Sequence, residues 1–183
     1  DYNDKYEYIL PEINLDKNLI SSEKIGNISL LSNYKAHKYD TNKFANFLIN
    51  DFEWSSNQKN FNTGITGKFL GNFKNINYET KNIDLYKKDT TSEFYGALGY
   101  LSEINLKKKV LASIHSLKPK ILVRYAPGSM RKENSGSRLN PDSAFTMDRL
   151  NNFNSFETGL SGTLGFDYNI KSNKKEFDFS LAQ

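Results

Sequence analysis

Residues 156–170 read FETGLSGTLGFDYNI, and the polarity of this stretch alternates with a period of two. One set of positions is apolar, aromatic or small: Phe156, Thr158, Leu160, Gly162, Leu164, Phe166, Tyr168 and Ile170. The residues between them are polar or glycine. Successive side chains of a β-strand point to opposite faces, so the stretch predicts a strand with one apolar and one polar face. Such a strand is long, because strands of globular proteins usually have only about 3–10 residues.

The same alternation recurs along most of the chain. Clear further strands are expected at Asn27–Lys38, Thr63–Tyr78, Lys120–Tyr125 and Phe177–Leu181, and noisier ones at Tyr6–Ile13, Lys43–Ser55 and Glu93–Leu101. In Lys43–Ser55 both faces carry apolar residues, so its facing stays open. Pro119 favours extended chain over a helical turn at Val110–Leu117. The pattern predicts an all-β fold: one antiparallel up-and-down meander of about eight or nine long strands.

The connections between these strands are rich in residues that favour turns. Asn and Asp tolerate left-handed backbone and cap their own chain, and they gather between the expected strands. Longer connections are expected at Asp16–Gly26, Thr80–Thr90 and Gly128–Asp142. No linker or repeat divides the sequence, so residues 1–183 are expected to belong to a single domain. The chain begins at Asp1 with no leader, so we expect it to be mature or cut from something longer.

Composition removes several classes of protein. The 183 residues include no cysteine, which excludes a disulfide scaffold, a Cys-ligated zinc site and a cysteine nucleophile. Aromatic residues make up 14% of the chain, which argues against disorder although the mean hydropathy is −0.67. No run approaches the ~18 apolar residues of a transmembrane helix. The net charge of +4 is too mild to indicate a partner.

Alternation alone fits either a soluble β-sandwich or a membrane β-barrel. The length of the strands favours the barrel, and so does a polar face dense in Asn, Ser, Thr and Lys. Several aromatic residues also lie toward strand ends, where a barrel has its aromatic girdles: Tyr34, Trp54, Tyr78, Tyr100, Tyr125 and Tyr168. Lipid-facing positions are then Ile28, Leu30, Ile65, Phe69, Phe73, Val123, Leu160, Leu164 and Phe166. Lumen-facing polar positions are Lys68, Asn72, Lys74, Arg124, Glu157 and Asp167.

No catalytic, cofactor or metal site is expected. Neither His37 nor His115 has an acid and a hydroxyl at a motif spacing, and no Gly-x-Ser-x-Gly elbow exists. Asp51 and Glu53 share a strand face, but solvated carboxylates explain them better than acid–base catalysis. Lys107–Lys109 and Arg131–Lys132 are expected in solvated connections. Nucleic-acid binding is excluded, because aromatic and basic residues alternate on opposite faces whereas a stacking groove needs both on one face.

Five stretches, taken together and in order, resemble a known family. They are residues 9–13 (ILPEI), 50–54 (NDFEW), 117–127 (LKPKILVRYAP), 156–168 (FETGLSGTLGFDY) and 177–183 (FDFSLAQ). The sequence resembles the carboxy-terminal barrel of the LPS-assembly family LptD, also called organic solvent tolerance proteins. The resemblance covers nearly all of the chain, although no single stretch is specific by itself.

The resemblance implies a function. The chain would be an internal segment of an integral outer-membrane barrel that inserts lipopolysaccharide into the outer leaflet, without enzymatic activity or cofactor. Its partners would be lipopolysaccharide, outer-membrane lipids and the family's lipoprotein plug, LptE. As such a segment, the chain would lack the family's amino-terminal periplasmic domain and its first and last barrel strands, and the cysteines of some members have no counterpart in it. A diffusion porin or receptor-type barrel, and a soluble β-sandwich binding module, stay open as alternatives.

Overall fold

The computed structural model describes residues 8–38, 42–61, 64–84, 86–87, 89–111, 113–130, 141, 143–150, 155–172 and 175–183. These residues form ten strands of one antiparallel sheet. The strands are β1 (Tyr8–Ser22), β2 (Gly26–Lys38), β3 (Phe44–Ser55), β4 (Lys59–Asn60), β5 (Ile65–Lys81), β6 (Thr91–Ile104), β7 (Leu106–Val110), β8 (Ser113–Ala126), β9 (Gly159–Ser172) and β10 (Glu176–Ala182).

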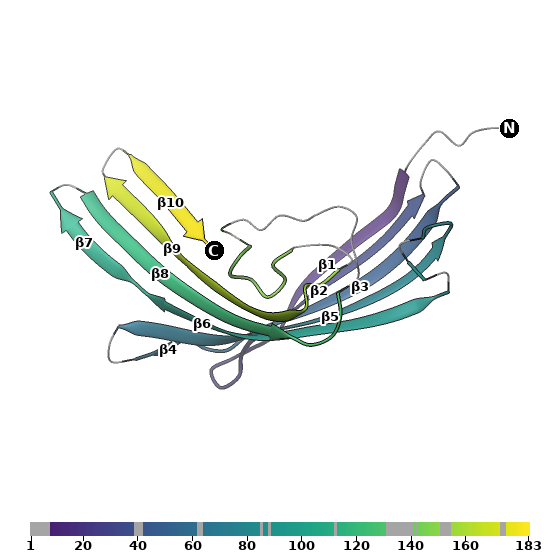
Figure 1. Cartoon of the computed structure of the whole chain (residues 1–183), viewed down its shortest axis with the longest axis horizontal. Coiled ribbons are helices and arrows are strands. Elements are labelled where there is room, and N and C mark those ends of the chain that lie inside the picture. The colour runs from purple at the N-terminus through teal and green to yellow at the C-terminus, as the bar shows by residue number, and fades with distance from the viewer. Residues whose placement is uncertain are drawn as a thin grey trace.

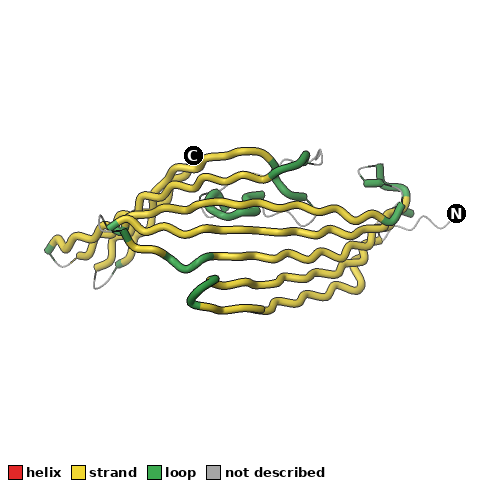
Figure 2. The backbone as a smooth tube through the Cα atoms, turned by 90° about the horizontal axis from the view of Figure 1, so that it is seen from below, coloured by secondary structure: helices red, strands yellow, loops and turns green. Residues whose placement is uncertain are grey.

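The strands follow one another across the sheet in the order β1-β2-β3-β5-β6-β8-β9-β10. The two remaining strands are short: β4 pairs with β5, and β7 pairs with β8. Figure 1 shows the sheet bent into a trough, and Figure 2 shows its long strands running side by side. The all-β, up-and-down meander predicted from the alternation is therefore confirmed, while the sheet is open and does not close into a barrel.

Strand boundaries differ from the sequence-based expectation in several places. β1 runs to Ser22, through residues expected to form a connection, and only Glu23–Ile25 separates it from β2. Gly26 permits this tight turn, since its φ is +94° and a Cβ there would lie 2.0 Å from the carbonyl oxygen of Ser55. Lys107–Lys109 lie in β7 and not in a connection, although their side chains are exposed. Arg131–Lys132 lie outside the described residues.

Pro119 lies inside β8, where a proline removes one ladder hydrogen bond. On that edge β8 changes partner: Lys120 is opposite Glu103 of β6, whereas Leu117 is opposite Leu106 of β7. The proline therefore lies at the break between β6 and β7, where the ladder is already interrupted.

The register assigns every side chain to one of two faces. Asp51 of β3 is opposite Lys74 of β5, and Arg124 of β8 is opposite Gly99 of β6. Lys74 and Arg124 contact described residues of the β8–β9 connection, and this part of the connection lies in the hollow of the sheet in Figure 1. These positions therefore define the concave face. The alternate positions, such as Phe73 opposite Phe52, define the convex face.

Two aromatic residues depart from the facing expected for them. Phe156 was expected on the apolar face of a strand with Leu160, but β9 begins only at Gly159, whose φ is +110°. This left-handed residue ends the alternation, and Phe156 is completely buried on the concave side. Tyr78 was expected in an exposed girdle, but it lies on the concave face and packs against Phe47 and Tyr86.

The contact between β9 and β10 provides a test of this packing. A Cβ at Gly165 would lie 2.2 Å from the carbonyl oxygen of Leu181 and 2.9 Å from the Phe145 ring. We expect Gly165→Ala to lower the free energy of unfolding by about 1–3 kcal/mol, because overpacking forces the backbone apart. Chemical denaturation measures the change.

Gly162 on the same strand is the matched control, because a Cβ there meets nothing within 4 Å. Gly162→Ala should leave the unfolding midpoint nearly unchanged. Equal midpoints for the two variants would contradict the described β9–β10 contact.

Candidate functional site

The candidate site is the concave face together with the chain folded onto it. Residues 143–150 and 155–158, here called the inner segment, belong to the connection between β8 and β9. Figure 1 shows part of this connection inside the trough. Two sheet residues, Lys74 and Arg124, carry the contacts that hold it there.

Lys74 joins the centre of the sheet to the inner segment. Its ammonium group lies 3.4 Å from an Asp51 carboxylate oxygen and also forms an ion pair with Asp148. The Asn72 amide donates a 2.5 Å hydrogen bond to the other oxygen of Asp51. The Lys74 side chain is only 4% exposed. Since a buried ammonium is stable only with partners, the fold depends on both carboxylates.

Arg124 makes the second connection through backbone oxygens. Its Nε donates to the Met147 carbonyl and its Nη2 to the Glu157 carbonyl, both at 2.6 Å. The guanidinium also lies 5.1 Å from the centre of the Phe156 ring, within cation–π range. Arg124 is 1% exposed. One side chain therefore holds both parts of the inner segment.

The inner segment is also braced internally and against β9. Arg149 forms an ion pair with Glu157, and its Nη1 donates to the Thr163 hydroxyl at 3.3 Å. On the neighbouring strand Lys120 pairs with Asp167 and lies 5.2 Å from the centre of the Phe145 ring.

Burial affects the charge on the inner segment directly. Loss of solvent raises the pKa of the Asp148 carboxyl above its ordinary value, and the Lys74 ammonium opposes that rise. The ionised carboxylate is therefore stabilised chiefly by Lys74. Removing that lysine would leave Asp148 and Asp51 close together without their shared cation.

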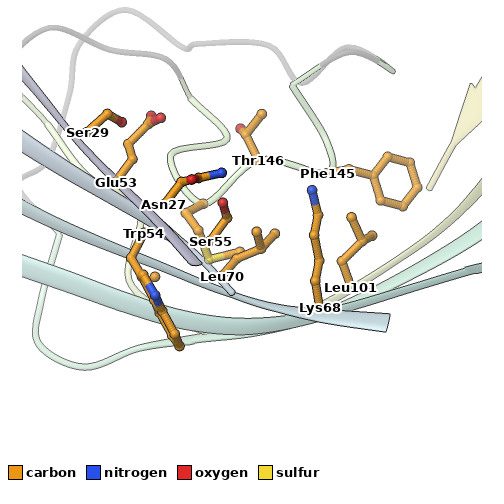
Figure 3. Close-up of a pocket in the computed structure, with 12 residues that line it drawn as sticks. Asn27, Ser29, Glu53, Trp54, Ser55, Lys68, Leu70, Leu101, Phe145 and Thr146 are labelled. Atoms are coloured by element: carbon orange, nitrogen blue, oxygen red, sulfur yellow. The ribbon is translucent and has the colours of Figure 1, made fainter. Parts of the chain in front are cut away.

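A cavity of about 280 Å³ lies beside the inner segment (Figure 3). The Lys68 side chain extends from β5 toward Phe145 and Thr146 of the inner segment, and the Glu53 side chain extends from the neighbouring strand β3. Leu70, Leu101 and Met147 add apolar surface. No ion pair joins Lys68 to another residue in the part of the chain that the structure describes.

The structure brings together part of the set expected to face a lumen. Lys74, Asn72, Arg124 and Glu157 join in the contacts of the inner segment, Asp167 pairs with Lys120, and Lys68 lines the cavity. Glu157 precedes β9 and belongs to no strand. The nine positions expected to face lipid all lie on the convex face: Ile28, Leu30, Ile65, Phe69, Phe73, Val123, Leu160, Leu164 and Phe166.

Sequence reasoning missed the residues that the inner segment contributes. Asp148, Arg149 and Met147 lie outside any alternating stretch, so strand periodicity carries no signal for them. The available hint is a mixture of aromatic, aliphatic and charged residues at 143–150, which is unusual for a solvated loop. Among the described residues, no group of three or more His, Asp or Glu is placed to hold a metal ion.

The contacts of the inner segment predict that removing Lys74 detaches this segment from the sheet often enough to be measured. Ser155 is 1% exposed, and the chain has no cysteine, so Ser155→Cys provides a single buried thiol. We expect Lys74→Met to raise the labelling rate of this thiol at least about tenfold, because breaking a buried ion pair costs about 3–5 kcal/mol. Maleimide labelling under native conditions measures the rate.

Lys68→Met in the same Ser155→Cys background is the control, because Lys68 lies on the same strand and face without an ion pair to the described residues. Its labelling rate should match that of Ser155→Cys alone. Equal rates in the Lys74 and Lys68 variants would show that Lys74 does not hold the inner segment.

Comparison with known proteins finds no family model that matches the chain and no curated protein that matches its sequence. Among the described residues, no helix is long and apolar enough to cross a membrane. The family suggested by the five sequence stretches therefore stays a prediction. Function must be argued from the two faces of the sheet and from the inner segment.

Proposed function

We propose that this chain forms part of the wall of an outer-membrane β-barrel that inserts lipopolysaccharide into the outer leaflet. The observation that carries the membrane part is the opposite polarity of the two faces. Charged side chains gather on the concave face, while the middle of the convex face carries exposed apolar residues. A barrel in a membrane needs this arrangement, with lipid outside and water inside.

Exposure on the convex face supports contact with lipid. Phe69 is 51% exposed and Leu160 is 76% exposed, and many of their convex neighbours are also open. The described residues include no second sheet that covers this face. A soluble β-sandwich would bury such a face against a partner sheet, so this observation disfavours the sandwich alternative. An apolar hollow of about 530 Å³ also lies on this face beside Gly71 and Gly96.

The strands are long enough for this role. β5 has 17 residues and β6, β8 and β9 have 14 each, whereas crossing a bilayer at a tilt takes about 9–11 residues. A longer strand leaves residues to project beyond the hydrocarbon layer.

The connections suggest which end of the barrel faces outward. Glu23–Ile25 form a short turn at one end, where only three residues separate β9 from β10 and the other two connections contain β4 and β7. Residues 39–43, 82–90 and 127–158 connect strands at the opposite end. Outer-membrane barrels have short periplasmic turns and longer external loops. The end that carries residues 127–158 is therefore assigned to the outside of the cell.

Lipopolysaccharide as cargo rests on the resemblance to the LptD family. The same resemblance supplies the other expected partners, namely outer-membrane lipids and the lipoprotein plug LptE. The part of the concave face that the inner segment leaves open suits a passing sugar, because the cavity there is lined by hydroxyl, amide and charged groups such as those of Ser29, Asn27 and Lys68. No bond is made or broken in this role, which is therefore not enzymatic.

The inner segment supports one other candidate, a diffusion porin. A charged segment folded into a barrel narrows the water-filled space and selects solutes by size and charge. The two functions share the wall and differ in cargo. They are separated by the second experiment below.

Membrane insertion is tested by two neighbouring residues on opposite faces. Phe69→Asp should strongly reduce assembly in the outer membrane, because it removes a lipid-facing ring and puts a charged carboxylate on the lipid face, where charged substitutions are destabilising. Lys68→Asp, one residue away on the concave face, should assemble at normal yield. The yield of protein in isolated outer membranes is measured by immunoblot. Normal assembly of the Phe69 variant would show that this face does not meet lipid.

The cargo is tested by depletion in the bacterium that encodes the chain. We expect surface lipopolysaccharide, measured with an antibody on intact cells, to fall as the protein is depleted, while outer-membrane porins continue to assemble. Unchanged surface lipopolysaccharide, with slower uptake of small polar solutes, would instead favour the porin.

A further inference from the structure

A strip of polar side chains crosses the convex face near one end of the sheet. The Ser32 hydroxyl donates to Asn50 at 2.7 Å, and the Asn75 amide donates to Ser92 at 3.0 Å. Asn77 donates to Asn75 at 2.6 Å and accepts from Ser92 at 2.7 Å. These five residues, here called the polar strip, extend from β2 to β6. Their polar atoms bond to one another across the strands.

Beside the polar strip the convex face becomes apolar within one step of the alternation. On β5 the next convex position from Asn75 toward the middle of the strand is Phe73. Its ring centre lies 6.2 Å from that of Phe52 and 6.0 Å from that of Phe94. On β6 the change falls between Ser92 and Phe94, which is 66% exposed. The border therefore runs across these two strands between adjacent convex positions.

At the same distance along the strands, the concave face changes in the opposite way, from charged residues to apolar ones. Toward the middle of the sheet it carries the charges of Asp51 and Lys74. Beyond them the concave positions are apolar and buried, and they form a cluster with a residue of the β5–β6 connection: Ala45, Phe47, Ile49, Ile76, Tyr78 and Tyr86. The Glu93 carboxylate accepts hydrogen bonds from Tyr78 at 2.9 Å and Tyr95 at 3.0 Å.

This exchange of polarity has a direct physical meaning. A sheet in water buries its apolar side chains inward and exposes polar ones, whereas a barrel wall in lipid does the reverse. The convex positions of β5 from Ile65 to Phe73 span nine residues, close to the ~9–11 that a tilted membrane strand needs. The part of β5 beyond them has the polarity of a soluble sheet.

We propose that the edge of the apolar layer of a membrane crosses β5 between Phe73 and Asn75 and crosses β6 between Ser92 and Phe94. The strip residues of these two strands, Asn75, Asn77 and Ser92, then meet lipid headgroups, and the cluster around Ile76 and Tyr78 stands in water as a small core outside the apolar layer. This inference rests on the proposed membrane function and adds the position of the border. Leu48 and its partner Tyr34 lie beyond the strip on β3 and β2, so the proposal is confined to β5 and β6.

Nitroxide labels along β5 test the border. Because the chain has no cysteine, single variants Phe69→Cys, Phe73→Cys, Asn77→Cys and Glu79→Cys each carry one label on the convex face. The chain, with the strands that complete its barrel in the cell, is purified from outer membranes and placed in phosphatidylcholine–phosphatidylglycerol vesicles, and collisions of each label with oxygen and with a water-soluble nickel chelate are measured by power saturation. Oxygen should dominate at 69 and 73, and the nickel chelate at 77 and 79.

Ser92→Cys and Phe94→Cys repeat the test on β6, where nickel should dominate at 92 and oxygen at 94. Lys68→Cys on the concave face is the control for a wet surface inside the sheet.

The outcomes separate this inference from the proposed function. If collisions with oxygen dominate at all four β5 positions, or if the change from oxygen to the nickel chelate falls between 69 and 73, the proposed border is wrong while the membrane function stands. Nickel dominance at all four positions shows that the convex face is in water and overturns both. Protection from both agents at 69 and 73 indicates a covering protein and also overturns both.

Discussion

The fixed register between neighbouring strands is the constraint on which the rest of the structure depends. Side chains alternate strictly across a strand, so a slip of one residue would exchange the two faces completely. Such a slip on β5 would place Lys74 on the convex face and Phe73 among the buried charges. Long, continuous ladders prevent it: β3 and β5 stay in register from Phe44–Lys81 to Ser55–Leu70 without a bulge. The separation of charge from apolar surface follows from that pairing.

Small residues on the concave face give the inner segment room to lie close to the sheet. A Cβ at Gly99 would lie 2.6 Å from the Met147 methyl group, and one at Gly165 would approach the Phe145 ring. Arg124 is opposite Gly99 in the register, so the guanidinium and the space beside it come together on adjacent strands. The space above the glycines and the charge of Arg124 therefore favour the same position for the inner segment. A face with charges but no space, or with space but no charges, would not hold it there.

Periodicity in the sequence was sufficient to predict most strands and the shared face of the residues in the clearest ones, because alternation is a local property, but it left the facing of Lys43–Ser55 open. It failed where long-range contacts decide. Tyr78 has the alternation of a strand end, yet its environment depends on Tyr86 beyond the end of β5. Phe156 continues the pattern of β9 in sequence, but positive φ at Gly159 separates it from the strand. The contacts of Asp148 and Arg149 have no local period and required the folded chain to reveal them.

The open edges of the sheet decide what the proposed function requires. In this structure β1 and β10 are the first and last strands of the sheet and do not pair with each other. An edge strand in hydrocarbon would leave backbone amide and carbonyl groups without partners, each at a cost of several kcal/mol. A membrane wall built from this sheet therefore needs further strands that pair with β1 and β10 and close the ring. The gentle curvature in Figure 1 agrees with that requirement, because a trough this open would enclose a wide lumen only when more strands complete it. In such a barrel the inner segment would fill space in the lumen that side chains of the wall alone are too short to reach.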